Sequence, residues 1–168
     1  MQDFSYRPLT GDYAEAWQTL MLDGARNFPL GFLITEAELA ARSPTQCCAM
    51  LDAGQYRGLF VGEALIGFCG YRPQQLIRTR HRGEVGPFFV TQSYHGTGAA
   101  KALMQGVMSE ARAHGVEQLE LFVDSGNTRA VAFYERLGFT QISIHPDGAR
   151  IDGQSRTGFF YVLRLSDK

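Results

Sequence analysis

A Gly-Thr-Gly turn in the middle of the chain has the composition of a phosphate-binding loop. Gly96 and Gly98 stand where an apolar segment, 85–90, runs into an amphipathic one that begins near residue 98. Glycine lacks Cβ, so its backbone can approach a ligand closely and adopt unusual dihedral angles. The free N–H groups of a first helical turn attract anions such as a phosphate or pyrophosphate. A plain strand-to-helix turn, with glycines only for tightness, is the alternative interpretation.

Two common phosphate motifs do not fit this segment. A Walker A loop needs Gly-Lys-Ser/Thr, but Ala99 and Ala100 separate Gly98 from Lys101. A Rossmann fingerprint needs a third glycine where Lys101 stands, and its glycines follow the strand almost at once. A nucleotide site of either kind is therefore not predicted.

A second group of residues that could bind a ligand or transfer a proton follows about 30 positions later. Asn127 stands before an apolar-periodic segment and can cap a helix there, with or without a further role. Tyr134 lies two turns into that helix. A phenol with a pKa of about 10 can protonate a departing thiolate. A half-buried aromatic ring whose hydroxyl contacts water is the alternative interpretation of Tyr134.

The apolar periodicity and the turn residues predict the elements that position these groups. The expected strands are 4–7, 57–61, 65–71, 82–91, 119–123, 139–144 and 159–165. Capping-box spacing of Asp12 with Glu15, Thr35 with Glu38 and Ser43 with Gln46 predicts three helix starts. The expected helices are therefore one from Asp12, two short pieces ending near Gly54, and two longer ones, 98–114 and 127–137, with loops at 28–32 and 146–155. This order predicts an α/β (α+β) fold, with a mixed, mostly antiparallel central sheet and helices on both faces.

Composition narrows the class of protein. The chain has 168 residues, 45% of them hydrophobic, which suits one domain over 1–168. A net charge of −1 argues against nucleic-acid binding. No apolar run approaches the ~20 residues of a membrane helix, and the N-terminus does not have the pattern of a signal peptide. Three cysteines without a CxxC pair predict free thiols, no metal site and a cytoplasmic location.

Taken together, the two chemical segments resemble the GCN5-related N-acetyltransferase (GNAT) superfamily. His95-Gly-Thr-Gly98-Ala-Ala100 is similar to its motif A, Arg/Gln-x-x-Gly-x-Gly/Ala, and residues 127–139 match its motif B almost letter for letter. The stretch Arg80-His-Arg-Gly-Glu-Val85 also looks like the Lys-His-Lys-Gly-like stretch that some members of the superfamily have. The predicted order of elements agrees with the GNAT fold, so the resemblance covers essentially the whole chain.

The resemblance implies binding of acetyl-CoA or another short acyl-CoA. It implies that the pantetheine arm pairs with the backbone of residues 88–90. It also implies that the pyrophosphate binds the amides of residues 96–101, in the glycine turn and the first helical turn. Asn127 should bond the pantetheine or the thioester region, and Tyr134 should lie near the sulfur. The implied binding residues are Phe88, Phe89, Val90, His95, Gly96, Thr97, Gly98, Ala99, Ala100, Lys101, Asn127 and Tyr134. His95 departs from the motif's Arg or Gln, which predicts weaker or pH-sensitive affinity.

The implied chemistry is direct attack of a primary amine on the thioester in a ternary complex. The N–H of Val90 is the expected oxyanion donor, and Tyr134 the general acid. Glu84 is the expected base, directly or through water, although it could be only an exposed strand end; Asp124 and His81 are lesser candidates. Phe122 stands where some family members carry a glutamate, so that variant of the mechanism is excluded.

The acceptor is the least constrained part of the prediction. A small amine, an amino acid or a peptide N-terminus would fit, with Trp17 and the segments 28–32, 72–82 and 146–156 as expected lining. The cluster Arg78–Arg82 could attract an acidic acceptor or be a solvated hairpin. A non-catalytic acyl-CoA-binding regulatory domain and an unrelated nucleotide-binding domain are the alternative functions. Apolar residues on both faces of 159–165 predict a possible homodimer.

Overall fold

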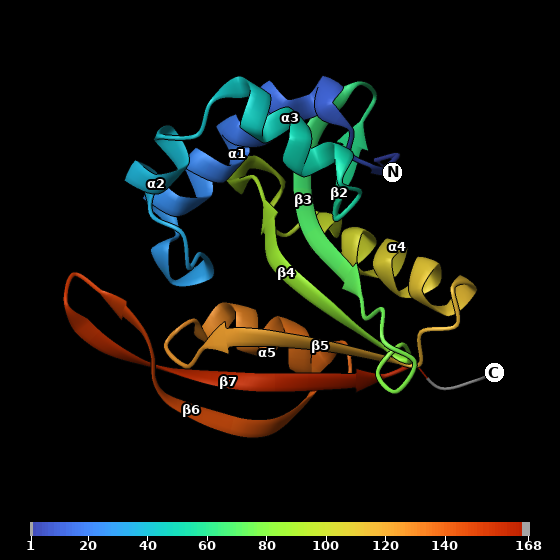
Figure 1. Cartoon of the computed structure of the whole chain (residues 1–168), viewed down its shortest axis with the longest axis vertical. Helices are drawn as coiled ribbons and strands as arrows, with labels where there is room; N and C mark the ends of the chain where they lie inside the picture. The colour runs from blue at the N-terminus through green and yellow to red at the C-terminus, as the bar shows by residue number, and fades with distance from the viewer. Residues whose placement is uncertain (1, 166–168) are drawn as a thin grey trace.

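The computed structural model describes residues 2–165 as one seven-stranded sheet with helices on both faces (Figure 1). The strand order is β1-β2-β3-β4-β5-β7-β6. The strands are β1 Ser5–Pro8, β2 Tyr56–Val61, β3 Ala64–Pro73, β4 Arg82–Val90, β5 Gln118–Asp124, β6 Thr140–Ile151 and β7 Gln154–Arg164. The helices are α1 Ala14–Asn27, α2 Glu36–Ala40, α3 Pro44–Asp52, α4 Ala99–Ala113 and α5 Thr128–Arg136, with 3-10 turns η1 Gly11–Tyr13, η2 Pro29–Gly31 and η3 Gln92–Tyr94.

The sheet is mixed and mostly antiparallel, as predicted. Every neighbouring pair of strands is antiparallel except β4 and β5. Those two pair only over Arg82–Glu84 and Gln118–Glu120. Beyond this short ladder they diverge, as Figure 1 shows, and leave a V-shaped opening in the middle of the sheet.

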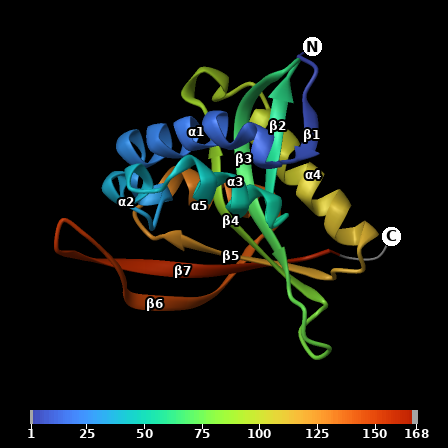
Figure 2. The same ribbon diagram turned by 45° about the horizontal axis from the view of Figure 1, so that its top comes forward.

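Each face of the sheet carries its own core. On one face α1, α2 and α3 enclose a cluster around Trp17, Leu51 and Phe68. On the other face α4 and α5 pack on a cluster that includes Leu103 and Leu119. The same grouping of α1, α2 and α3 is visible in the turned view (Figure 2). Successive residues of a strand point to opposite faces of the sheet, so the continuously buried runs of β2 and β3 supply side chains to both cores.

The predicted loop at 146–155 is wrong, because this segment belongs to a long β-hairpin. Strands β6 and β7 stay paired up to Ile151 and Gln154, and the turn is formed by Asp152 and Gly153 with φ of 50° and 76°. Two successive positive φ values are typical of the type I′ turn that Asp-Gly favours. The earlier Asp147, with φ of 49°, lies inside a bulge between His145 and Ala149. The pair Asp147-Gly148 therefore forms an irregularity within β6, and the strand continues beyond it to Ile151.

The predicted helix starts are right at two places and wrong at one. Thr35 with Glu38 and Ser43 with Gln46 form complete capping boxes. Near Asp12, by contrast, η1 precedes α1 and no side chain caps it. The backbone N–H of Gly11 instead donates to Asp52 Oδ1 at 2.7 Å, at the end of α3. A tertiary contact thus replaces the expected local cap.

Within the described residues, no helix combines the length and apolar character needed to cross a membrane.

Candidate active site

Strand β4 directs part of its backbone into the opening between β4 and β5. The N–H of Thr91 donates to the Ile66 carbonyl at 2.9 Å, next to the register pair Gly67–Val90. This bond makes Gly67–Val90 a non-hydrogen-bonded pair, because the two kinds of pair alternate along an antiparallel ladder. The N–H and C=O of Val90 therefore point away from β3. The same alternation turns those of Phe88 into the opening, and those of Phe89 toward β3.

A tight contact between β3 and β4 lies where β4 leaves β5. A Cβ at Gly70 would stand 2.2 Å from the Gly86 carbonyl oxygen, so only glycine fits there. The ladder is irregular between Cys69 and Tyr71, next to this contact. Arg72 Nη1 donates to the Gly86 carbonyl at 2.8 Å and fixes the chain at this point. Gly86 lies two residues after Glu84, the last residue of β4 that pairs with β5.

The turn between β4 and α4 leaves backbone donors without partners. Gly96 and Gly98 have φ of 76° and 91°, a region that favours glycine. Gly98 is the N-cap of α4 and no side chain caps this helix. Among residues 2–165, no acceptor bonds the N–H groups of Gly96, Gly98, Ala99, Ala100 and Lys101. Free N–H groups at the start of a 15-residue helix form an anion site.

His95 connects this turn to two other elements. Its Nε2 lies 2.8 Å from the Val90 carbonyl oxygen, and its Nδ1 lies 2.8 Å from Nη1 of Arg129 in α5. The ring of Phe28, which follows α1, contacts His95 at 5.6 Å between centroids. Sequence reasoning listed His95 and placed Phe28 in the lining, but it gave Arg129 no role.

Asn127 caps α5 as predicted and keeps a free donor. Its side-chain oxygen accepts from the Ala130 N–H at 3.3 Å. Its Nδ2 has no acceptor in the part of the chain that the structure describes. The preceding turn is held by Asp124, which accepts from the Gly126 N–H at 2.7 Å and from Arg156.

The same contacts make Asp124 a poor candidate base. Its hydrogen bonds from Arg156 hold the pKa of the buried carboxyl below its ordinary value. A carboxylate with a lowered pKa and two committed oxygens takes up a proton less readily. The pairing brings β7 to the end of β5, and the sequence alone did not indicate it.

Tyr134 reaches from α5 toward β4. The residue is 8% exposed, and its ring lies 6.3 Å from that of Phe88, edge to face. Burial raises the pKa of the Tyr134 phenol, with a smaller contribution from the nearby Cys69. No group within residues 2–165 hydrogen-bonds its hydroxyl. The phenol therefore stays protonated at neutral pH and keeps its donor free.

Glu84 stands at the apex of the opening. It is the last residue of β4 that pairs with β5, where its partner is Glu120. Its side chain is half exposed and lies 3.2 Å from Arg72 Nη2, measured from Oε1. Glu120 is paired separately with Arg82 at 3.3 Å. The expected lesser candidate His81 is exposed and lies just before β4.

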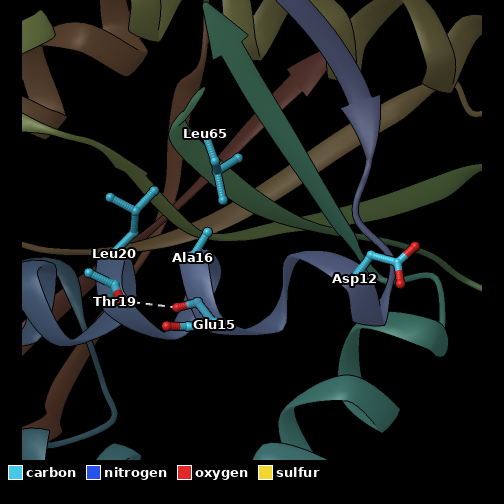
Figure 3. Close-up of a pocket in the computed structure, with 6 residues that line it drawn as sticks. All are labelled: Asp12, Glu15, Ala16, Thr19, Leu20 and Leu65. Carbon is cyan, nitrogen blue, oxygen red and sulfur yellow. Dashed lines mark hydrogen bonds between the residues drawn. The ribbon is translucent and has the colours of Figure 1, made fainter. Parts of the chain in front are cut away.

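Other features of the described chain lie apart from this opening. A hollow beside α1 is lined by Asp12, Glu15, Ala16, Thr19, Leu20 and Leu65 (Figure 3). None of these residues belongs to β4, α4, β5 or α5. Across residues 2–165, no three His, Cys, Asp or Glu side chains are grouped so that they could hold a metal ion.

Comparison with solved structures places the fold. An N-acetyltransferase from Staphylococcus aureus Mu50 superposes with a TM-score of 0.83 at 16% identity, over 98% of this chain and 99% of that one. The protein yncA from Salmonella typhimurium, solved with its cofactor acetyl-CoA, gives a TM-score of 0.81 at 16% identity, over 98% and 95%. At this identity the likeness establishes the fold alone.

Sequence comparison gives more specific relatives. A mycothiol acetyltransferase from Salinispora tropica is 34% identical over 144 residues, which are 84% of this chain and 45% of that protein. One from Corynebacterium glutamicum is 34% identical over 90 residues, 52% and 28% of the two chains. The chain thus spans less than half the length of these relatives.

The family model of the acetyltransferase (GNAT) family matches residues 12–139, which contain both the glycine turn and the Asn127–Phe139 segment. This match confirms the family that the two sequence segments predicted. The chain belongs to the acetyltransferase (GNAT) family.

Proposed function

We propose that this chain transfers an acetyl group from acetyl-CoA to the primary amine of a small molecule, by direct attack in a ternary complex. The observation that carries the proposal is the opening between β4 and β5, into which Phe88 turns its N–H and C=O and Val90 turns an unpaired N–H. An extended pantetheine arm carries amides that can pair with such a strand edge. The family match supplies the class of reaction.

The coenzyme would be held at three places. The backbone groups of Phe88 would pair with the pantetheine, and the N–H of Val90 would face the thioester at its end. Phe89 would contribute its buried ring to the core behind them. The free amides of Gly96 and of residues 98–101 would receive the pyrophosphate. Thr97 between them is held in place, because its hydroxyl donates to the Tyr94 carbonyl at 2.7 Å. The free Nδ2 of Asn127 would donate to a pantetheine or thioester carbonyl.

The chemistry needs a base, an oxyanion donor and an acid. Glu84 would take a proton from the ammonium form of the acceptor, directly or through water, because only the neutral amine has a lone pair. The C–N bond would then form while the Val90 N–H donates to the carbonyl oxygen, where negative charge develops. As the C=O bond re-forms and the C–S bond breaks, Tyr134 would give its proton to the leaving sulfur. The attached nitrogen would release its extra proton to water, and Tyr134 would recover one from solvent.

A small-molecule acceptor is favoured over a protein or nucleic acid. The relatives are named mycothiol acetyltransferases, after a small molecule. The net charge of −1 does not suit a polyanionic partner. Arg72 and Arg82, which flank the apex, already pair with Glu84 and Glu120, so they offer less charge to an acidic acceptor than Arg78 and Arg80 do.

A screen for CoA release across classes of amine tests the proposal. The panel contains amino acids, amino sugars, peptides with free N-termini and a mycothiol-type acceptor, with thiol release followed at saturating acetyl-CoA. We expect turnover with at least one small amine and loss of that turnover in Glu84→Gln. Tight binding of acetyl-CoA without turnover on any amine would support the alternative of a non-catalytic regulatory domain.

The proposal includes a cytoplasmic location and a homodimer. Cys47, Cys48 and Cys69 are free, which suits a reducing compartment.

The exposed face of β7 supports the homodimer. On β7, Tyr161 and Leu163 are buried, whereas Phe160 is 38% exposed and contacts Phe122 on the opposite face. A second copy could cover that face. A monomeric mass in light scattering at micromolar concentration would contradict the dimer.

A further inference from the structure

Arg129 is fixed beside the phosphate-binding turn by a contact that also sets the state of His95. Its Nη1 lies 2.8 Å from His95 Nδ1. A guanidinium has only N–H donors, so Nδ1 must be the acceptor. The His95 proton is then on Nε2, which donates to the Val90 carbonyl at 2.8 Å. This network requires a neutral His95.

The network relocates the positive charge of the site. A neutral histidine brings no charge to the position where the family motif has Arg or Gln. Arg129 is permanently charged at all relevant pH values. Its guanidinium is held at residue 95, next in sequence to the free amides that begin at Gly96. The cation thus comes from α5 instead of from the loop itself.

Arg129 differs from the nearby arginines, because they are paired with carboxylates and it bonds a histidine. Arg72, Arg82 and Arg156 each bond a carboxylate, on Glu84, Glu120 and Asp124 respectively. Arg129 bonds only His95 within residues 2–165. Its side chain is exposed, and the remaining N–H groups of its guanidinium have no protein acceptor there. An arginine held in place without a carboxylate partner suits the binding of an external anion.

We propose that Arg129 is a coenzyme-binding residue that contacts a phosphate group of CoA, and that His95 positions it. This inference rests on acetyl-CoA occupying the opening between β4 and β5. The pyrophosphate and the 3′-phosphate of CoA share the chemistry that Arg129 recognises, namely phosphate oxygens that accept paired N–H donors.

Calorimetric titration of Arg129→Met with CoA is the first test. We expect the affinity to fall by on the order of tenfold, equivalent to ~1.4 kcal/mol, because a charge-assisted contact is lost. Binding of acetyl-pantetheine, which has no phosphates of CoA type, should stay unchanged. The matched control is Arg136→Met, an exposed arginine in the last turn of the same helix, which should bind CoA like the unmodified protein.

Dephospho-CoA identifies the phosphate. An equal loss with CoA and dephospho-CoA assigns the pyrophosphate, and a loss seen only with CoA assigns the 3′-phosphate. Unchanged CoA affinity in a folded Arg129→Met protein would overturn the inference. Failure of the unmodified protein to bind CoA at all would refute the proposed function instead, so the two failures are distinguishable.

A double-mutant cycle tests the role of His95. His95→Ala should weaken CoA binding, and Arg129→Met should cost little more in the His95→Ala background. His95→Gln should restore most of the affinity, since an amide can donate to Val90 and accept from Arg129. Additive losses in the cycle would show that His95 does not position Arg129.

Discussion

Two polar clusters on the α4 side of the sheet are organised in opposite ways. In the first, Tyr6 donates to Glu110 Oε2 at 2.5 Å, and Arg57 donates to both oxygens of the same carboxylate, with its closest contacts at 2.8 and 2.7 Å. In the second, the opening between β4 and β5, the Tyr134 hydroxyl and the amides of Gly96 and of residues 98–101 have no partner in the described chain. Both clusters contain a largely buried tyrosine.

The difference separates structural polar groups from functional ones. Buried polar groups that only support a fold are nearly always hydrogen-bonded within it. Groups that are left unpaired at the edge of a sheet and at the start of a helix carry a free-energy cost unless water or a ligand satisfies them. The first cluster therefore ties β1, β2 and α4 together, whereas the second is the site that we propose for acetyl-CoA.

Removing the hydroxyl of Tyr134 should give the largest effect. Tyr134→Phe keeps the ring beside Phe88 and deletes the proton donor. We expect kcat to fall by roughly 10²- to 10⁴-fold, the usual contribution of a positioned general acid, with CoA affinity and Tm little changed. Steady-state kinetics with a competent amine, measured with Tm on the same preparation, checks this. Near-normal kcat would show that Tyr134 is not the acid.

Glu110→Gln should instead reduce stability. Burial by itself would raise the pKa of Glu110, but its hydrogen bonds from Arg57 and Tyr6 outweigh burial and lower the pKa. The charged group should contribute on the order of 2 kcal/mol. Because the folded-state pKa is lower than the ordinary value of 4.5, the ionised carboxylate stabilises the fold fully at pH values above 4.5. This contribution is lost as the pH falls through the folded-state pKa.

Urea unfolding across pH 3 to 7 measures this contribution. The unmodified protein should lose more stability on acidification than Glu110→Gln does, and kcat at neutral pH should be retained while the variant is folded. A parallel pH dependence of the two proteins would argue against the assignment.

Gly98→Asp should weaken coenzyme binding by tenfold or more, at least ~1.4 kcal/mol. The new carboxylate would stand at the N-cap of α4 and repel the pyrophosphate. Gly115→Asp is the matched control, because Gly115 follows the other end of α4 and also has a positive φ, 74° against 91°. Calorimetry that shows equal CoA affinity for the two folded variants would contradict the anion site.

Tyr6→Phe should give the smallest effect and completes the comparison of the two tyrosines. One hydrogen bond to Glu110 is lost while those from Arg57 remain, so we expect about 1 kcal/mol of destabilisation. The value of kcat should not change. A large loss of kcat at unchanged stability would show that the first cluster also takes part in catalysis.

Features that depend on a few neighbouring residues were predictable from the sequence. The glycine turn before α4, the Asn127 cap and the capping boxes at Thr35 and Ser43 were all anticipated correctly. Each depends on a φ preference or on a hydrogen bond that spans at most three residues. The family also follows from two such local segments in the right order.

Long-range contacts were decided only by the tertiary structure. The register with β3 determines that Phe88 and Val90, and not Phe89, turn their backbone groups into the opening. Arg129 meets His95 across 34 positions, and Arg156 meets Asp124 across 32. No local preference encodes such pairs, because they depend on how the cores on the two faces bring α5 and β7 against the ends of β4 and β5. The sequence alone therefore established which chemical groups are available to this protein, and packing selected which of them face the opening between β4 and β5.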